Sequence, residues 1–313
     1  MKEKFLLILS ASTIFIILIA YFLLPIASPQ ISKPSRLFFS QLLEKAKNEE
    51  PITLIAVGDI MLGRSVNAKM QKLNDFSYPF LKTADFLKSA NLTFANLESP
   101  FYDDCPTTNT GMIFCADPKA VEGLVFAGID VVNLANNHTR NYGEIGIRKT
   151  IELLNKNNLS IIGLNDNLVQ KEIRGMKFGF LGFDLTSGYQ EESIVQAVQE
   201  NSLRVDVLIV SFHWGAEYAK EPIEKQIELA HKIIDAGADL ILGHHSHVIQ
   251  KIEDYHGAKI VYSLGNFIFD QPWSEETKKG LVGLFTFEGK KLTKAEFKEV
   301  YIRDYSQPEF TTR

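Results

Sequence analysis

Two histidines separated by a single residue, His245 and His247, stand just after the apolar run Leu240–Gly243. Extended backbone leaving a strand can aim both imidazoles of such a pair at one metal ion, so we predict that both are metal ligands. His244 is next to them, and on an extended chain its side chain points the other way. We therefore expect His244 to support the site from outside or only to pack.

Polar residues also stand at the ends of five other apolar runs. These clusters contain Asp59, Glu98, Asn137 with His138, His213 and Asn266. In an open α/β sheet, ligands bind in the crevice beyond the carboxyl ends of the strands. We therefore predict one metal site, which combines the histidine pair with Asp59, Glu98, Asn137 and His213.

This donor set mixes imidazole, carboxylate and amide oxygen and contains no thiolate. Such donors suit Mn²⁺, iron, Zn²⁺ or Mg²⁺ and do not suit a structural cysteine zinc site. A carboxylate such as Glu98 can bridge two ions roughly 3.5–4 Å apart, an arrangement that clamps the attacking and leaving oxygens in phosphoryl transfer. We expect two divalent ions, of Mn, Fe or Zn.

Two further side chains are candidates for direct roles in a reaction. His138 follows a pair of asparagines at a strand end, where it can protonate a leaving oxygen; capping a helix or supporting a ligand is the alternative. Arg64 follows Gly63 in the first loop and could hold an anionic substrate group, or be an ordinary surface charge. Glu217 and Tyr218 could orient a ligand histidine or begin a helix.

Short apolar runs that alternate with helical patterns must position these residues. The predicted strands are Ile52–Val57, Leu92–Asn96, Val131–Leu134, Ser160–Gly163, Lys177–Phe183, Val207–Phe212, Leu240–Gly243 and Lys259–Leu264. The predicted helices are Pro79–Ala90, Pro118–Ala127, Gly143–Asn157 and Pro222–Ala236. Alternation of strands and helices predicts an α/β fold.

Composition divides the 313 residues into an anchor, a linker and a folded domain. A net charge of -5 makes nucleic acid an unfavourable partner. Phe5–Leu24 carries no charge and is long enough to cross a bilayer, although a cleaved signal peptide is an alternative. Lys2 and Lys4 favour a cytoplasmic N-terminus, which puts the domain outside the cell. We predict an anchor at 1–24, a linker at 25–50 and the domain at 51–313.

The only two cysteines, Cys105 and Cys115, lie close together in a polar segment. Outside the membrane the environment is oxidising, so a short disulfide loop is one interpretation and two free thiols are the other. The spacing differs from that of a CxxC redox or zinc motif, so we assign the pair no catalytic part.

Six blocks of sequence resemble the CapA proteins of poly-γ-glutamate capsule synthesis in order and approximate spacing. They are Gly58–Arg64, Asn96–Pro100, Asn136–His138, His213–Tyr218, Gly243–Val248 and Ser263–Phe267. The resemblance covers Ile52 to about Asp270. That family is similar to the calcineurin-like metallophosphoesterases, which implies a four-layer α-β-β-α sandwich with a two-metal site at the strand ends.

The resemblance also implies a role for each site residue. Glu98 would be the bridging carboxylate and His138 the proton donor. The remaining metal ligands would be Asp59, Asn137, His213, His245 and His247. Met61 departs from the Asp-x-His motif of the wider pattern, so one imidazole of the first metal position is missing, and Glu98 stands where Asp is usual.

Two classes of function fit these residues. One is a metal-dependent hydrolase or transferase, which would act on a phosphate ester or an anionic polymer at the outer membrane face; a stand-alone phosphoesterase is a variant of it. The other is a non-catalytic, anion-binding component of a poly-γ-glutamate synthesis and export complex. The chain lacks a G-x-S-x-G elbow and a P-loop, so ATP-driven ligation would belong to a synthetase partner.

Overall fold

The structure, a computed structural model, describes residues 50–165 and 167–311. The expected membrane anchor at Phe5–Leu24 and nearly all of the linker lie outside these residues. Within the described ranges, every helix is too short or too polar to cross a bilayer.

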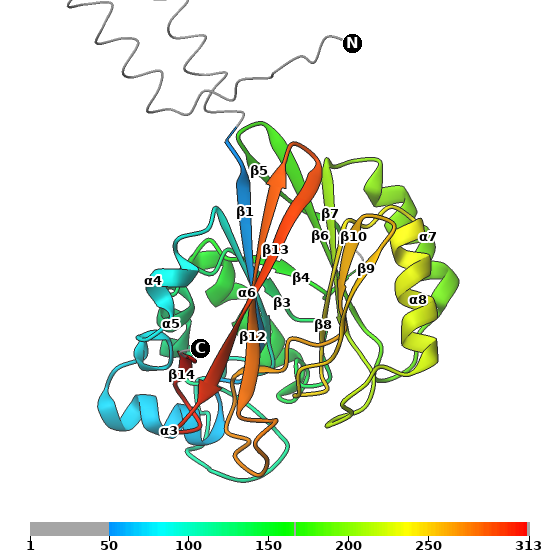
Figure 1. The fold of residues 1–313 in the computed structure, drawn as a ribbon. Helices are drawn as coiled ribbons and strands as arrows, with labels where there is room; N and C mark the ends of the chain where they lie inside the picture. The colour runs from blue at the N-terminus through cyan, green and yellow to red at the C-terminus, as the bar shows by residue number, and fades with distance from the viewer. Residues whose placement is uncertain (1–49, 166, 312–313) are drawn as a thin grey trace, which may run out of the picture. The chain divides into compact units, whose positions relative to one another are not determined.

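Two mixed β-sheets form the centre of the domain (Figure 1). The first has the spatial order β14 (Pro308–Phe310), β13 (Lys291–Ile302), β12 (Lys279–Glu288), β1 (Ile52–Ile60), β2 (Leu92–Leu97), β3 (Val131–Asn133) and β4 (Ser160–Ile162), with β11 (Asn266–Ile268) paired to the end of β1. The second has the order β5 (Val169–Ile173), β6 (Met176–Asp184), β7 (Val207–His213), β8 (Leu240–His244), β10 (Ala258–Val261) and β9 (Ile252–Tyr255).

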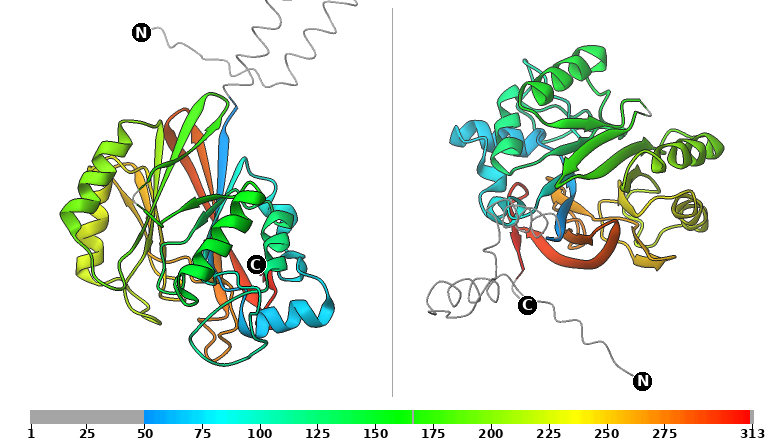
Figure 2. Two further views of the ribbon diagram at one scale, coloured as in Figure 1. Left: turned by 180° about the vertical axis from the view of Figure 1, so that it is seen from behind. Right: turned by 90° about the horizontal axis from the view of Figure 1, so that it is seen from above.

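Helices cover the outer face of each sheet (Figure 2). The first sheet carries α3 (Arg64–Leu73), α4 (Ala84–Leu87), α5 (Val121–Phe126) and α6 (Gly143–Lys156), with short 3₁₀ helices η1 (Tyr78–Phe80) and η2 (Pro118–Ala120). The second carries α7 (Glu191–Ser202) and α8 (Glu224–Asp235). The predicted four-layer α-β-β-α sandwich is therefore confirmed.

The alternation of side chains along the strands assigns residues to three separate cores. In β1, Ile55 and Val57 pack toward the helices of the first sheet, whereas Leu54 and Ala56 face the second sheet. In β7, Ile209 belongs to the core between the sheets, and its neighbours on both sides pack under α7 and α8. Both faces of these strands are buried, which explains why they read as continuous apolar runs.

Most predicted elements are found within a few residues of their expected bounds, but one helix is wrong. The range Pro79–Ala90 contains η1 and α4, which are separate short helices. Thr83 lies between them, and its hydroxyl donates a hydrogen bond to the carbonyl of Phe80 at 3.3 Å. A side chain that binds the local backbone in this way competes with a continuous helix.

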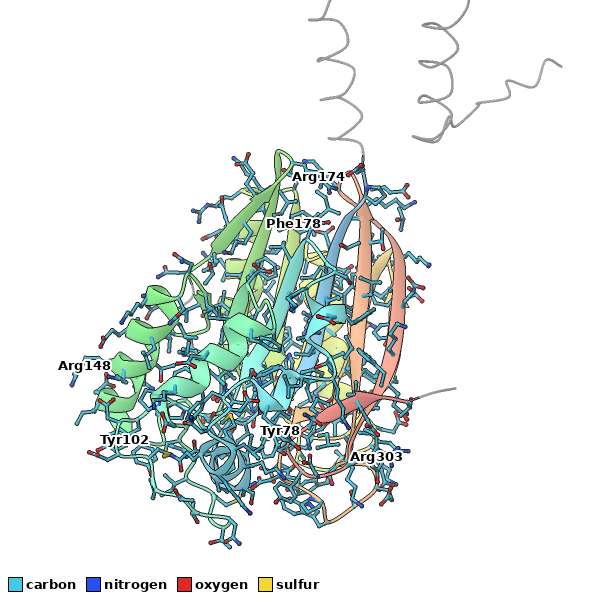
Figure 3. The ribbon with its side chains drawn as sticks, turned by 90° about the vertical axis from the view of Figure 1, so that its left-hand side faces the viewer. Tyr78, Tyr102, Arg148, Arg174, Phe178 and Arg303 are labelled. Carbon is cyan, nitrogen blue, oxygen red and sulfur yellow. A yellow bond between two sulfur atoms is a disulfide. The ribbon has the colours of Figure 1, made fainter. Side chains whose placement is uncertain are left out.

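The strands β1 to β4 are mutually parallel, as are β6, β7, β8 and β10, so their carboxyl ends gather at one end of the domain (bottom of Figure 1). The opposite end is where β1 begins. There the Arg174 guanidinium, in the turn after β5, donates to the carbonyl of Pro51 at 3.1 Å (Figure 3).

Two glycines allow segments of backbone to approach each other closely near the carboxyl ends of the strands. A Cβ on Gly58 would lie 2.1 Å from the carbonyl oxygen of Gly265, and one on Gly243 would lie 2.0 Å from that of Tyr262. Each glycine directly precedes a polar residue of a strand-end cluster, Asp59 in β1 and His244 in β8. Only glycine fits a backbone approach this close.

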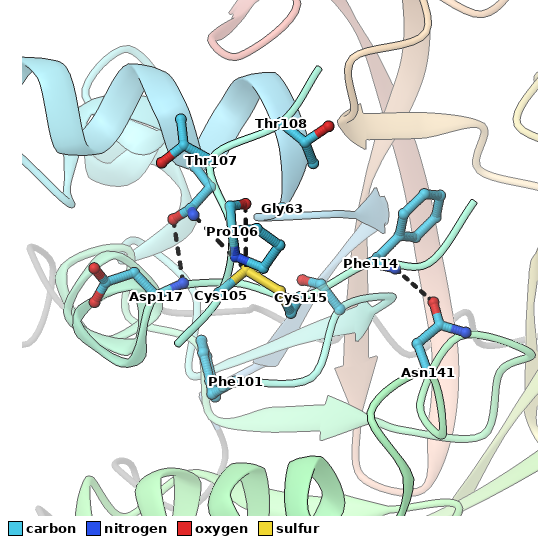
Figure 4. The surroundings of a disulfide bond; sticks show 12 residues. Gly63, Phe101, Cys105, Pro106, Thr107, Thr108, Phe114, Cys115, Asp117 and Asn141 are labelled. Atoms are coloured by element: carbon cyan, nitrogen blue, oxygen red, sulfur yellow. Dashed lines mark hydrogen bonds between the residues drawn. A yellow bond between two sulfur atoms is a disulfide. The ribbon is translucent and has the colours of Figure 1, made fainter. Parts of the chain in front are cut away.

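Cys105 and Cys115 form a disulfide (Figure 4). The bond closes the loop that follows Tyr102, and of the two interpretations of this pair the structure shows the disulfide. Residues 109–113 at the tip of the loop are exposed, whereas Phe114 and Cys115 at its base are buried.

Candidate functional site

Asp59, at the end of β1, is a buried carboxylate with hydrogen-bond partners from both sheets. Its carboxylate accepts from Nδ1 of His244 at 2.8 Å, Nδ2 of Asn96 at 2.9 Å and the backbone N–H of His245 at 3.2 Å, and it lies 3.2 Å from Nδ1 of His247. Burial raises the pKa of an aspartate, but the bonds from His244 and His247 outweigh it and hold the pKa of Asp59 well below its usual range.

Asn96, in β2, links the two buried carboxylates of the site. Its Nδ2 donates to Asp59 and, at 3.0 Å, to Oε1 of Glu98, while its Oδ1 accepts from Asn133 at 3.1 Å and Asn136 at 3.2 Å. Burial, followed by the nearby Asp59 charge, raises the pKa of Glu98 well above its usual range. A cation between the two groups would instead stabilise both in their charged forms.

His213 and Asn137 are brought together from different sheets. His213 ends β7, and its Nε2 lies 3.0 Å from Oδ1 of Asn137 in the loop after β3. On the other side of the ring, Nδ1 lies 3.4 Å from Nδ2 of Asn96 and 3.7 Å from Glu98. Burial lowers the pKa of His213 well below its usual value, which keeps the ring neutral and able to bind a cation.

The prediction that the His244 side chain points away from the site is wrong, whereas the supporting role expected for it agrees with its bond to Asp59. Nδ1 of His244 contacts Asp59 directly. The reason is the backbone of His245, whose φ of 92° ends the extended conformation on which the alternation rule depends. The turn continues at His247, with a φ of 58°, and all three histidines converge.

The donor atoms fall into two overlapping groups. Ligand atoms of Asp59, Glu98 and His247 lie within 4.8 Å of one another, and so do those of Glu217, His245 and His247. Glu217 follows β7 and was expected only to orient a histidine or begin a helix. The structure adds its carboxylate to the candidate ligands.

Several buried atoms of the site have no hydrogen-bond partner among the described residues. They are Oε2 of Glu98, Nε2 of His244 and Nδ1 of His245. Buried polar atoms are nearly always satisfied, so three orphans in one place need an explanation. Nitrogen and oxygen donors without thiolate fit Mn, Fe or Zn, and a bound divalent ion would satisfy them.

His138 lies beside these groups, and its ring is held in one orientation. Nδ1 lies 3.0 Å from Oδ1 of Asn141, and the ring stacks on Phe114 with centroids 4.0 Å apart. Burial lowers the pKa of His138 to about 4, against a smaller opposite effect from Asn141. The ring is therefore neutral at pH 7 and must accept a proton before it can donate one.

Arg64 does not present a free guanidinium. Its side chain is buried, pairs with Asp270 and donates to the carbonyl of Gly111 at 2.9 Å, and its Cζ lies 4.6 Å from the centre of the Phe114 ring. An anionic substrate would have to compete with Asp270 for it. This geometry favours a structural role over the predicted substrate contact.

The sequence contained a signal for some of the residues that were not assigned a role. Asn96 and Asn266 stand in the strand-end clusters, and Oδ1 of Asn266 lies 3.0 Å from Nδ1 of His247. The sequence carried no signal for Asp270, because its role depends on Arg64, which is 206 residues away in the chain.

We expect Arg64→Met to lower the free energy of unfolding by about 3–5 kcal/mol, because it leaves Asp270 buried without its partner. The Arg64→Met/Asp270→Leu double variant should lose less than the single variant. Urea unfolding measures both, with Arg148→Met on the exposed face of α6 as a control that should change by about 0.5 kcal/mol or less. An Arg64→Met protein of unchanged stability would return Arg64 to the substrate-binding interpretation.

Comparisons with known proteins agree with the resemblance of the six blocks. The capsule biosynthesis protein CapA of Bacillus anthracis is 31% identical over 268 residues, which cover 76% of this chain and 64% of that protein. The PGA biosynthesis protein CapA of Bacillus subtilis is 30% identical over 262 residues, which cover 76% of this chain and 68% of that protein. The chain thus spans about two thirds of the length of these relatives.

Among solved structures, a hypothetical protein from Thermus thermophilus has the same fold, with a TM-score of 0.53 at 16% identity, over 79% of this chain and 98% of the other. The family model described as bacterial capsule synthesis protein PGA_cap matches residues 53–271. That match covers well over half of the chain, which therefore belongs to the PGA_cap family of bacterial capsule synthesis proteins.

Proposed function

We propose that this protein is a membrane-anchored, metal-dependent hydrolase of the phosphoesterase type that acts in poly-γ-glutamate capsule synthesis. One observation carries the catalytic part: carboxylates and imidazoles from the ends of β1, β2, β7 and β8 converge, and three of their buried atoms have no partner among the described residues. The capsule part is supported by family membership and by the names of the two Bacillus relatives.

Asp59, Glu98 and His247 would hold one ion, and Glu217 and His245, with Asn137 and His213 close by, would hold a second; His247 lies within reach of both groups but can bind only one of the two ions. A divalent ion there would supply Lewis-acid stabilisation of the charge that develops on a phosphoryl or carbonyl oxygen. Asn96 would orient the two carboxylates. His138 would accept a proton at Nε2 during attack and return it to the leaving oxygen.

The partners would be a polymer synthetase and export subunits, because the chain has no P-loop with which to drive ligation itself. The substrate would be a phosphate ester or the anionic polymer.

A non-catalytic, anion-binding component of the same complex is the second candidate. Met61 favours it: the side chain is buried, and its sulfur accepts a hydrogen bond from the N–H of Gly63 at 3.0 Å, so this position supplies no imidazole. Without that imidazole, the first metal position would bind its ion more weakly.

Metal analysis tests the site. We expect the full-length protein, loaded with Mn²⁺ or Zn²⁺ and desalted, to retain metal, and the His245→Ala/His247→Ala variant to bind at least about tenfold more weakly. Glu217→Gln should weaken binding in the same direction, whereas His256→Ala, on an exposed turn, should leave it unchanged. A folded double variant that keeps the wild-type metal content would remove the pair from the ligand set.

Turnover separates the two candidate functions. With Mn²⁺ supplied, phosphate monoesters, diesters and poly-γ-glutamate are the substrates to assay. His138→Ala should lower kcat by about 10²–10⁴-fold and leave the metal content nearly unchanged, because His138 moves a proton and holds no metal. His256→Ala is again the control. If the metal-loaded wild type converts none of these substrates but binds the polymer, the anion-binding component is the correct function.

The anchor and its orientation can be tested in cells. Lys2, Lys4 and the uncharged Phe5–Leu24 run predict that added protease digests the domain in cells stripped of their wall, whereas a reporter fused to the N-terminus stays protected. A C-terminal domain that is protected from the protease contradicts this orientation.

A further inference from the structure

The disulfide-closed loop reaches the site through Phe114. This residue precedes Cys115 and is completely buried, whereas Met112 and Ile113 before it are exposed. The backbone at the base is held next to the end of β2, because the N–H of Ala116 donates to the carbonyl of Pro100 at 2.9 Å. The cross-link to Cys105 holds the same base from the other side of the loop (Figure 4).

Phe114 makes two separate contacts with the surroundings of His138. Its ring stacks on the imidazole, with an angle of 26° between the planes. Its backbone N–H donates to Oδ1 of Asn141 at 2.7 Å (Figure 4). The loop therefore determines both the plane of the imidazole and the orientation of the Asn141 amide.

The amide orientation determines where the imidazole carries its proton. A backbone N–H can only donate, so the atom of Asn141 that faces Phe114 is the carbonyl oxygen. The same oxygen lies 3.0 Å from Nδ1 of His138. Because an oxygen lone pair cannot bind a nitrogen lone pair, Nδ1 must carry the hydrogen, and Nε2 of the neutral ring is unprotonated.

We propose that Phe114, held by the Cys105–Cys115 disulfide, and Asn141 are positioning residues that keep His138 in its Nδ1–H form, with Nε2 free to accept a proton in the site. The disulfide thus acts on the reaction through the tautomer of a histidine. The catalytic consequence rests on the proposed function, but the tautomer itself does not.

The tautomer can be measured directly. Full-length protein labelled with ¹⁵N only in its seven histidines, kept metal-free with a chelator, gives long-range ¹H–¹⁵N spectra that distinguish Nδ1–H from Nε2–H rings. The His138 signals are identified by their loss in His138→Gln. We expect the Nδ1–H pattern in the wild type; an Nε2–H pattern overturns the proposal without any variant or substrate.

Variants then test the chain of contacts. Asn141→Asp keeps an oxygen that accepts from both Phe114 and His138, so it should keep the Nδ1–H pattern. Asn141→Leu and the Cys105→Ser/Cys115→Ser double variant should shift His138 toward Nε2–H. Met112→Ala, at the exposed tip of the same loop, is the matched control and should change nothing. A cysteine variant that folds and retains the Nδ1–H form removes the disulfide from the proposal.

Activity is the second readout. The variants that lose the Nδ1–H form should lower kcat by about 10²-fold, because the accepting nitrogen is lost or misplaced, with metal content unchanged. Asn141→Asp should restore most of the loss seen in Asn141→Leu. If the wild type shows the Nδ1–H form but has no turnover, the proposed function fails and the positioning of His138 stands.

Discussion

The buried carboxylate of Asp59 is the contact on which this end of the molecule depends. It accepts hydrogen bonds from Asn96 of the first sheet and from His244 and His245 of the second. A buried anion is costly unless it is well satisfied, and here its partners come from both layers. The relative position of the two sheets at the site is thus maintained by the same group that would bind a cation, so the packing of the sandwich and the geometry of the site depend on one carboxylate.

A second set of contacts extends from this centre to the surface. Phe114 packs against His138 and lies under the guanidinium of Arg64, which in turn pairs with Asp270 and the carbonyl of Gly111. Four segments that are distant in sequence, after β1, β2, β3 and β11, therefore meet around one aromatic ring. Side-chain packing and a covalent cross-link hold these segments in place, since none of them belongs to a sheet.

The sequence was informative where a local rule of geometry applied. Parallel strands present their carboxyl ends at one edge, so Asp59 and Glu98 of the first sheet could be grouped from their positions in the chain; His213, in the second sheet, joins them through the packing of the two sheets. The same kind of rule failed at His244, because the left-handed backbone of the next residue reverses the alternation. The hairpin of β12 and β13 went unrecognised: β13 is half exposed and rich in Lys and Glu, so it has no apolar run, whereas the apolar run at residues 281–287 of β12 was overlooked. The Arg64–Asp270 pair could not be predicted, since it depends on how distant loops meet.

Gly58 and Gly243 also constrain the geometry of the site, although neither has a side chain that could take part in it. Each stands one residue before a side chain of the site, where another segment of backbone passes within about one atomic diameter of the missing Cβ. A methyl group at either position would push Asp59 or His244 away from the other donors. A substitution at either glycine should therefore disturb the site, although neither residue contributes a ligand atom, so the geometry of this end of the domain depends on tight backbone packing as well as on its ligands.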